Sequence, residues 1–244
     1  MFNVSIRSAR CADIACGLGG VTIATAGLLT LFDRPSILFV FLLIITSVFL
    51  MRWQRRSDYV GLFVGATFGN LTELLCDAAG VWEHPTRQVF GLAPLYIFGC
   101  YPLLGLALPR MIAGVASRER PEFEGEGSTL LHASLIWAAH AGLSCRFGRN
   151  NDLEMLVCLL CLVLTLARFH STHDLITALL GGLLGMAWEL PCTISGVWRF
   201  PDPQFLGLIP LWLPLAYAIF FVNLCRITAA ISQRIDVRVS NYVS

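Results

Sequence analysis

Long apolar runs alternate with short polar breaks along this chain. A helix that crosses about 30 Å of hydrocarbon needs about 20 mostly apolar residues. Eight runs reach or approach that length, so we expect about eight transmembrane helices. Their approximate ranges are 14–32, 36–51, 59–79, 92–114, 128–145, 153–168, 172–193 and 207–231.

The second half of the chain repeats the first at a constant offset of 116 residues. The 38 residues that start at Asp58 align without a gap with the 38 that start at Asp174, and fourteen pairs are identical. Shared apolar composition would not keep Glu, Trp, Gln and Pro in register over that length. Each copy therefore comprises four helices. An even number gives both copies the same orientation, with a pseudo-two-fold axis along the membrane normal.

This repeat divides the chain into five parts. We expect a cytoplasmic N-terminus (1–12), repeat 1 (13–116), a polar linker (117–127), repeat 2 (128–232) and a cytoplasmic tail (233–244). Twelve arginines fall on the side of the two termini and five on the opposite side. The arginine-rich side of a membrane protein is usually cytoplasmic, which favours the inner or plasma membrane with both termini inside.

Composition agrees with a membrane protein and narrows its partners. The chain is 56% hydrophobic and 14% charged, with a mean hydropathy of +0.70, whereas soluble domains are about one quarter charged. A net charge of +1 argues against a nucleic-acid partner. Five histidines without an H-E-x-x-H motif predict no metal, and the absence of a P-loop fits the expectation of no cofactor.

Two acidic residues occupy matched positions within the expected membrane helices. Glu73 and Glu189 each lie seven residues before a helix end, about 10 Å below the surface. A carboxylate at that depth costs about 2.5–3.5 kcal/mol on insertion scales, so it is functional by default. Each Glu continues an i,i+4 stripe of small residues, which should turn it into the bundle. The alternative is a buried polar contact that only stabilises the fold.

Further candidates surround these two glutamates. Asp77 lies one turn after Glu73 and breaks the symmetry, because its counterpart is Thr193. His140 could relay protons or be a hydrogen-bonded core residue. Aromatic faces could stabilise a cation or form an interfacial belt. The aromatic residues expected near the same end of the bundle are Trp82, Trp198, Trp188, Tyr96 and Trp212.

One stretch of the second copy resembles a known family. Trp188-Glu189 is followed by Gly196-Val197-Trp198-Arg199-Phe200 and then by Gly207 and Pro210. This pattern resembles the small integral-membrane carotenoid and terpenoid enzymes, which include lycopene-cyclase-domain proteins, carotenoid hydratases and short membrane terpene cyclases. The first copy repeats the pattern more loosely through Glu73, Gly80-Val81-Trp82, Gly91 and Pro94.

The resemblance implies cofactor-independent carbocation chemistry in the bilayer. A carboxylic acid at Glu73 or Glu189 would protonate an alkene or epoxide of a lipid-soluble isoprenoid, and the cation would then cyclise or add water. We therefore expect a cyclase, isomerase or lyase with catalytic Glu73, Glu189 and Asp77. Its substrate would contact the aromatic set and His140. Two alternatives remain open: a proton-coupled transporter or lipid-binding protein, and a structural or assembly membrane protein.

Overall fold

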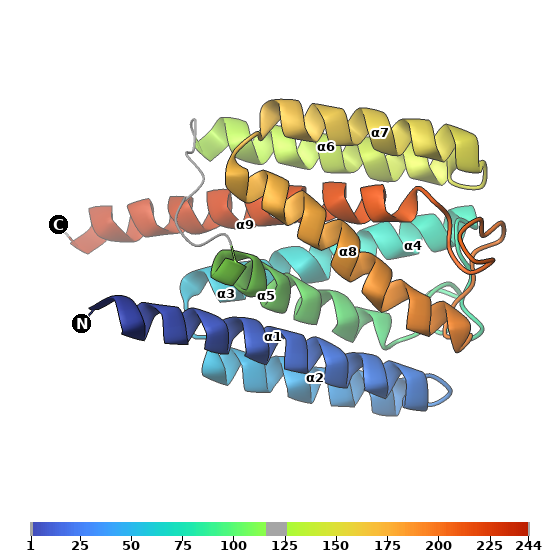
Figure 1. Cartoon of the computed structure of the whole chain (residues 1–244), viewed down its shortest axis with the longest axis horizontal. Coiled ribbons are helices and arrows are strands. Elements are labelled where there is room, and N and C mark those ends of the chain that lie inside the picture. The colour runs from blue at the N-terminus through green and yellow to red at the C-terminus, as the bar shows by residue number, and fades with distance from the viewer. Residues whose placement is uncertain (1, 116–125, 244) are drawn as a thin grey trace.

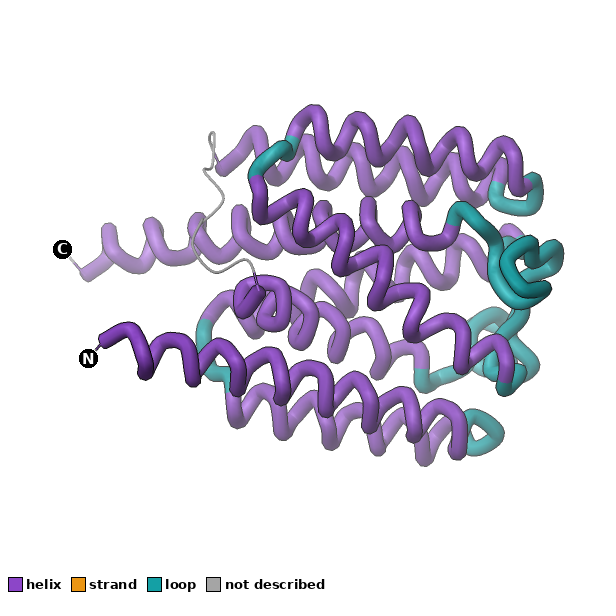
Figure 2. The backbone as a smooth tube through the Cα atoms, in the orientation of Figure 1, coloured by secondary structure: helices purple, strands orange, loops and turns teal. Residues whose placement is uncertain are grey.

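Helices and the loops that join them make up the part of the chain that its computed structural model describes, residues 2–115 and 126–243 (Figures 1 and 2). The π-helix η1 joins α3 to α4 without a break, so these residues form eight helical segments. In chain order the elements are α1 (Phe2–Leu31), α2 (Pro35–Arg52), α3 (Arg56–Val64), η1 (Gly65–Gly69), α4 (Asn70–Ala79), α5 (Ile97–Val115), α6 (Glu126–Phe147), α7 (Asn151–Arg168), α8 (Thr172–Ile194) and α9 (Leu213–Val243).

This architecture confirms a multi-pass, all-helical integral membrane protein. Among the described residues, six helices are long and apolar enough to cross a membrane. They occupy Arg10–Leu31, Pro35–Arg52, Arg56–Ala79, Ile97–Val115, Thr172–Ile194 and Leu213–Asp236. The hairpin of α6 and α7 lies outside this set. Three of the 18 residues of α7 are charged, namely Asp152, Glu154 and Arg168. The hairpin nevertheless runs beside the other helices and packs on α9 (Figure 1).

Two helices begin later than their apolar runs predict. The runs start near residues 92 and 207, whereas α5 starts at Ile97 and α9 at Leu213. The loops before them turn through two successive residues with positive φ, Phe90-Gly91 and Leu206-Gly207. A proline follows three residues after each glycine, and these loops satisfy their backbone groups without helix. Most of the expected polar linker lies outside the described residues.

The helices form one layered bundle with its two ends clearly distinguished. In the first half α5 packs against α1, α2 and α3, and in the second half α9 packs against α6, α7 and α8. Both ends of the chain lie at one end of the bundle, while the α4–α5 and α8–α9 loops meet at the other (Figure 1). This arrangement agrees with an even number of crossings. Which end faces the cytoplasm stays a prediction.

Buried ion pairs recur in the two halves at the 116-residue offset. The Arg110 side chain donates through Nε to Asp58 Oδ1 at 2.6 Å and through Nη2 to Asp58 Oδ2 at 2.5 Å. Arg226 makes the same two contacts with Asp174. Each pair joins the start of α3 or α8 to the following long helix, and all four side chains are buried. These matched contacts support the duplication, while the pseudo-two-fold axis stays a prediction.

Candidate functional site

Glu73 is buried at the centre of a hydrogen-bonded group in the first half. Its Oε1 accepts from Trp82 Nε1 at 2.7 Å and lies 2.6 Å from His84 Nε2, and its Oε2 accepts from Tyr101 OH at 2.7 Å. The helix α4 supplies Glu73, the loop after it supplies Trp82 and His84, and α5 supplies Tyr101. The carboxylate thus ties this loop to two helices.

Glu189 forms the matching group in the second half. Its Oε2 accepts from Trp198 Nε1 at 2.5 Å, and its Oε1 accepts from Tyr217 OH. Trp198 and Tyr217 correspond to Trp82 and Tyr101 at the 116-residue offset. His84 has no polar counterpart, because Phe200 stands at the equivalent position. Glu73 therefore has one more polar partner than Glu189.

The two groups meet at one pocket. We call it the glutamate pocket, and both carboxylates line it. Its aromatic and apolar walls come from both halves and include Trp82, Ile97, Tyr101, Leu104, Trp188, Trp198, Phe200 and Tyr217. The loops cross beside it: Glu83 and Arg199, which are equivalent residues, exchange backbone hydrogen bonds of 2.8 and 2.9 Å. The expectation that both glutamates face the interior is consistent with this arrangement.

Aromatic rings of one half pack against the loop of the other. The His84 ring lies 5.9 Å from Trp198, and the Phe200 ring lies 6.2 Å from Trp82, both edge-to-face. Such pairs add roughly 0.5–1.5 kcal/mol beyond the area that they bury. The tryptophans that bind the glutamates therefore also join the two halves.

A second, mostly apolar pocket adjoins the first, and we call it the side pocket. It shares Trp82, Tyr101, Glu189 and Tyr217 with the glutamate pocket. The predicted residues His140 and Trp212 line it, together with Thr72, Trp137, Ser144, Leu213, Ala216 and Phe220. The space between its atoms amounts to about 650 Å³, part of which is open to the outside. Trp212 is fixed there by a 3.0 Å bond from its Nε1 to Asn151 Oδ1.

Two predicted site residues lie apart from these pockets. Tyr96 is fully buried and donates a long hydrogen bond of 3.4 Å to the carbonyl of Val197, so it packs the loops together. Asp77 is buried on α4 and lines neither pocket. Neither of its carboxylate oxygens has a hydrogen-bond partner within the described residues.

The sequence reasoning missed three partners of the glutamates. Tyr101, Tyr217 and His84 hydrogen bond to them, but none was among the predicted site residues. The aligned segment ended at Leu95 and Leu211. Six residues further on, the same offset pairs Tyr101 with Tyr217, and fifteen residues on it pairs Arg110 with Arg226. Extending the alignment would have found both pairs.

The hydrogen bonds limit what the two carboxylates can do chemically. A carboxylate that accepts from indole and phenol donors on fixed elements is held in one orientation. Charge-assisted bonds of this kind are about twice as strong as neutral ones. The arrangement therefore favours fixed polar centres that organise the loops over acids that transfer protons to a substrate.

Comparisons with known proteins agree with the fold. No protein-family model and no curated protein matches the sequence. Two crystal structures resemble the chain: a mycobacterial Insig homologue, MvINS from Mycobacterium vanbaalenii, and a cross-linked trimer of a cysteine variant of MvINS. Each matches with a TM-score of 0.56 and 18% identity, covering 73% of this chain and 95% of the other. At this identity the similarity concerns the fold.

These neighbours overturn the expected family and activity. The resemblance to carotenoid and terpenoid enzymes is wrong, because the matching folds are Insig homologues. The expectation of a cyclase, isomerase or lyase acting on an isoprenoid is wrong with it. The Glu, Trp, Gly and Pro spacing that suggested the enzymes has a structural explanation. It builds a loop whose tryptophan binds the glutamate and whose positive-φ glycine permits the turn.

Proposed function

We propose that this chain is a non-catalytic membrane protein with a structural or assembly role. The observation that supports this most directly is that Glu73 and Glu189 serve as hydrogen-bond acceptors inside the bundle. Tryptophan and tyrosine donors hold both carboxylates, and the same tryptophans pack across to the other half. The glutamates thereby fix the loops at one end of the bundle. A cysteine variant of MvINS, whose fold is similar, was crystallised as a cross-linked trimer, which supports assembly of this chain with copies of itself.

A second role is favoured by the side pocket. Ligand sites are usually concave, mostly apolar and supplied with a few polar groups. The side pocket combines Trp137, Leu213 and Phe220 with the polar side chains of Thr72 and Ser144. It therefore suits part of a lipid-like molecule, a short apolar segment beside a small polar group. Such a ligand would contact both halves and would bias how the protein assembles.

A stability comparison tests the structural role of the glutamates. Glu73→Gln and Glu189→Gln each replace a charged acceptor by an amide, whose NH2 group faces an indole or phenol donor. Hydrogen bonds to charged groups contribute about 1.5–3 kcal/mol, so both variants should melt at clearly lower temperature in detergent. Glu83→Gln is the matched control because Glu83 lies in the same loop with an exposed side chain. Equal melting of all three variants would contradict the structural role.

Assembly and ligand binding can be read in one measurement. The full chain is extracted from its membrane in lipid nanodiscs, and native mass spectrometry gives the number of copies and any bound mass. We expect more than one copy per particle, and a lipid mass that is lost when Ala216→Trp fills the side pocket. Single copies without bound mass, in a protein that stays folded, would overturn both roles.

A further inference from the structure

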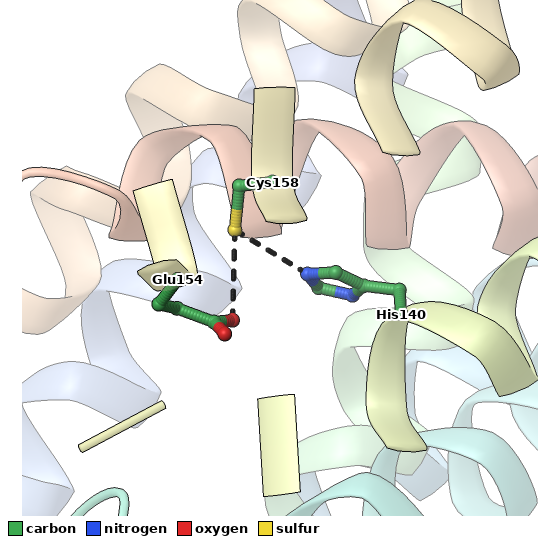
Figure 3. A group of neighbouring side chains, drawn as sticks. All are labelled: His140, Glu154 and Cys158. Carbon is green, nitrogen blue, oxygen red and sulfur yellow. Dashed lines mark hydrogen bonds between the residues drawn. The ribbon is translucent and has the colours of Figure 1, made fainter. Parts of the chain in front are cut away.

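Three buried side chains on α6 and α7 lie together outside the glutamate pocket. His140 comes from α6, and Glu154 and Cys158 lie one turn apart on α7 (Figure 3). Cys158 Sγ is 3.5 Å from His140 Nε2 and 3.7 Å from Glu154 Oε1. The three donor atoms all lie within 4.8 Å of one another. Glu154 and Cys158 are completely buried, and His140 is 7% exposed.

We propose that His140, Glu154 and Cys158 bind a zinc ion or a similar divalent transition metal. Zinc bonds to cysteine at about 2.3 Å and to histidine or carboxylate at about 2.0–2.2 Å. In a tetrahedron with those bond lengths the donor atoms are roughly 3.4–3.6 Å apart. The two separations at Cys158 are close to these values, and the third, between His140 and Glu154, lies within 4.8 Å and would close as the ion binds.

An unsatisfied atom points independently to a ligand. Glu154 Oε1 accepts from Ser144 Oγ at 2.5 Å, but Glu154 Oε2 is buried and has no hydrogen-bond partner among the described residues. An unpaired carboxylate oxygen in such a place is costly. A divalent cation would compensate the Glu154 carboxylate and the Cys158 thiolate with no net charge remaining. Binding would form bonds to sulfur, nitrogen and oxygen and would release the thiol proton to water.

The surroundings provide a hydrogen-bond partner for one ligand and a route by which the metal ion can enter. Ser144 lies one turn after His140 on α6, and its bond to Glu154 would orient the carboxylate as outer-shell partners do. His140 and Ser144 also line the side pocket, so that pocket gives access to the site. Three protein ligands leave a fourth position that water or a pocket ligand could fill. The motif search predicted no metal because the ligands come from two helices without a recognised spacing.

Metal analysis of the full chain tests this proposal. The protein is purified in detergent, dialysed against metal-free buffer and analysed by mass spectrometry for metals after addition of zinc alone. We expect about one zinc per chain in the wild type. Cys158→Ser, His140→Gln and Glu154→Gln should each lose it, and Ser144→Ala should bind about 10–100-fold more weakly. Cys161→Ser is the matched control because Cys161 is a buried thiol one turn further along α7.

Cobalt and a chelator keep the test independent of how the variants fold. Cobalt added to the metal-free wild type should give the intense visible absorption of a tetrahedral site and a sulfur-to-cobalt charge-transfer band. A chelator should lower the melting temperature of the wild type, and zinc should restore it. A wild type without bound zinc, cobalt absorption or chelator effect would overturn the proposal. Loss of zinc from Cys161→Ser equal to that from Cys158→Ser would overturn it also.

Discussion

At the scale of single residues, two buried aspartates inside this bundle have dedicated arginine partners. Asp174 illustrates this most clearly, because Arg226 and the Ser171 cap both bind its carboxylate. The Arg226 guanidinium also lies 5.0 Å from the centre of the Phe169 ring. The first half repeats the arrangement with Asp58, Arg110 and Trp53. Such pairs fix one helix against another, and they are costly to break because the remaining charge stays buried.

Removing one partner of a buried pair should be far more harmful than removing one at the surface. Asp174→Asn leaves the Arg226 charge without its carboxylate, which typically costs about 3–5 kcal/mol. Asp236→Asn is the control, because its pair with Arg56 is exposed and contributes about 0–1 kcal/mol. Thermal unfolding in detergent measures both variants. Comparable melting temperatures would show that the buried pair does not stabilise the fold.

The difference between the two glutamate groups predicts a tolerated substitution. His84→Phe gives the first half the residue that the second half carries at this position, Phe200. It keeps an aromatic ring against Trp198 and removes a buried ring nitrogen, Nδ1, that has no partner within the described residues. It also removes the contact of His84 Nε2 with Glu73 Oε1, but that oxygen still accepts from Trp82 Nε1. We expect a loss below about 1 kcal/mol.

Tyr101→Phe provides the comparison for this substitution, since it deletes the donor to Glu73 Oε2 and leaves nothing in its place. The loss should be about 1.5–3 kcal/mol. Chemical unfolding of the two variants under the same conditions ranks them. The prediction fails if His84→Phe is the more damaging change, which would assign the histidine a role that Phe200 cannot fill.

At the scale of elements, glycines determine how closely α3, η1 and α5 approach. A Cβ atom added to Gly105 would lie 2.3 Å from the Gly61 carbonyl oxygen and 2.8 Å from Gly65 Cα. The small-residue stripe predicted such an approach from sequence. It did not predict the π-helical turn, which occurs over Gly65–Gly69 and has no counterpart in α8. Periodicity alone cannot detect it, because most positions on either side of the turn are apolar and leave no clear stripe whose shift would show.

Two identical substitutions should therefore have opposite effects. Gly105→Ala forces a methyl group against backbone atoms that cannot move independently, and overpacking of this kind costs about 1–3 kcal/mol. Gly142→Ala places the same methyl group on α6, where nothing lies within 4 Å, and should stabilise the helix by up to about 1 kcal/mol. Melting temperatures in detergent decide between them. A harmless Gly105→Ala would mean that α5 can shift away from α3.

At the scale of the whole molecule, apolar run lengths and the repeat were sufficient to predict the class of fold. The starts of α5 and α9 were less predictable, because the loops before Ile97 and Leu213 are themselves apolar. In these loops the positive-φ residues and the prolines, not a change in hydropathy, set the position at which the helix begins. The glutamates could be found because isolated charges in apolar runs are conspicuous. Their partners Tyr101 and Tyr217 lie 28 residues away along the chain. The repeat pairs the two tyrosines with each other, but only the folded contacts show that they bind the glutamates.

The orientation of the bundle in the membrane is the remaining prediction at this scale. Both termini lie at one end, and the α6–α7 turn lies at the other (Figure 1). With twelve arginines on the side of the termini and five on the opposite side, we expect the termini in the cytoplasm.

Green fluorescent protein fused after the last residue should fluoresce, whereas alkaline phosphatase there should be inactive. Phosphatase inserted between Gly148 and Arg149, in the α6–α7 turn, should be active. The reverse pattern of activities would invert the assignment and would place the proposed metal site at the cytoplasmic end. Activity at both positions would mean an even number of crossings between the α6–α7 turn and the C-terminus, and therefore a hairpin of α6 and α7 that does not span the bilayer.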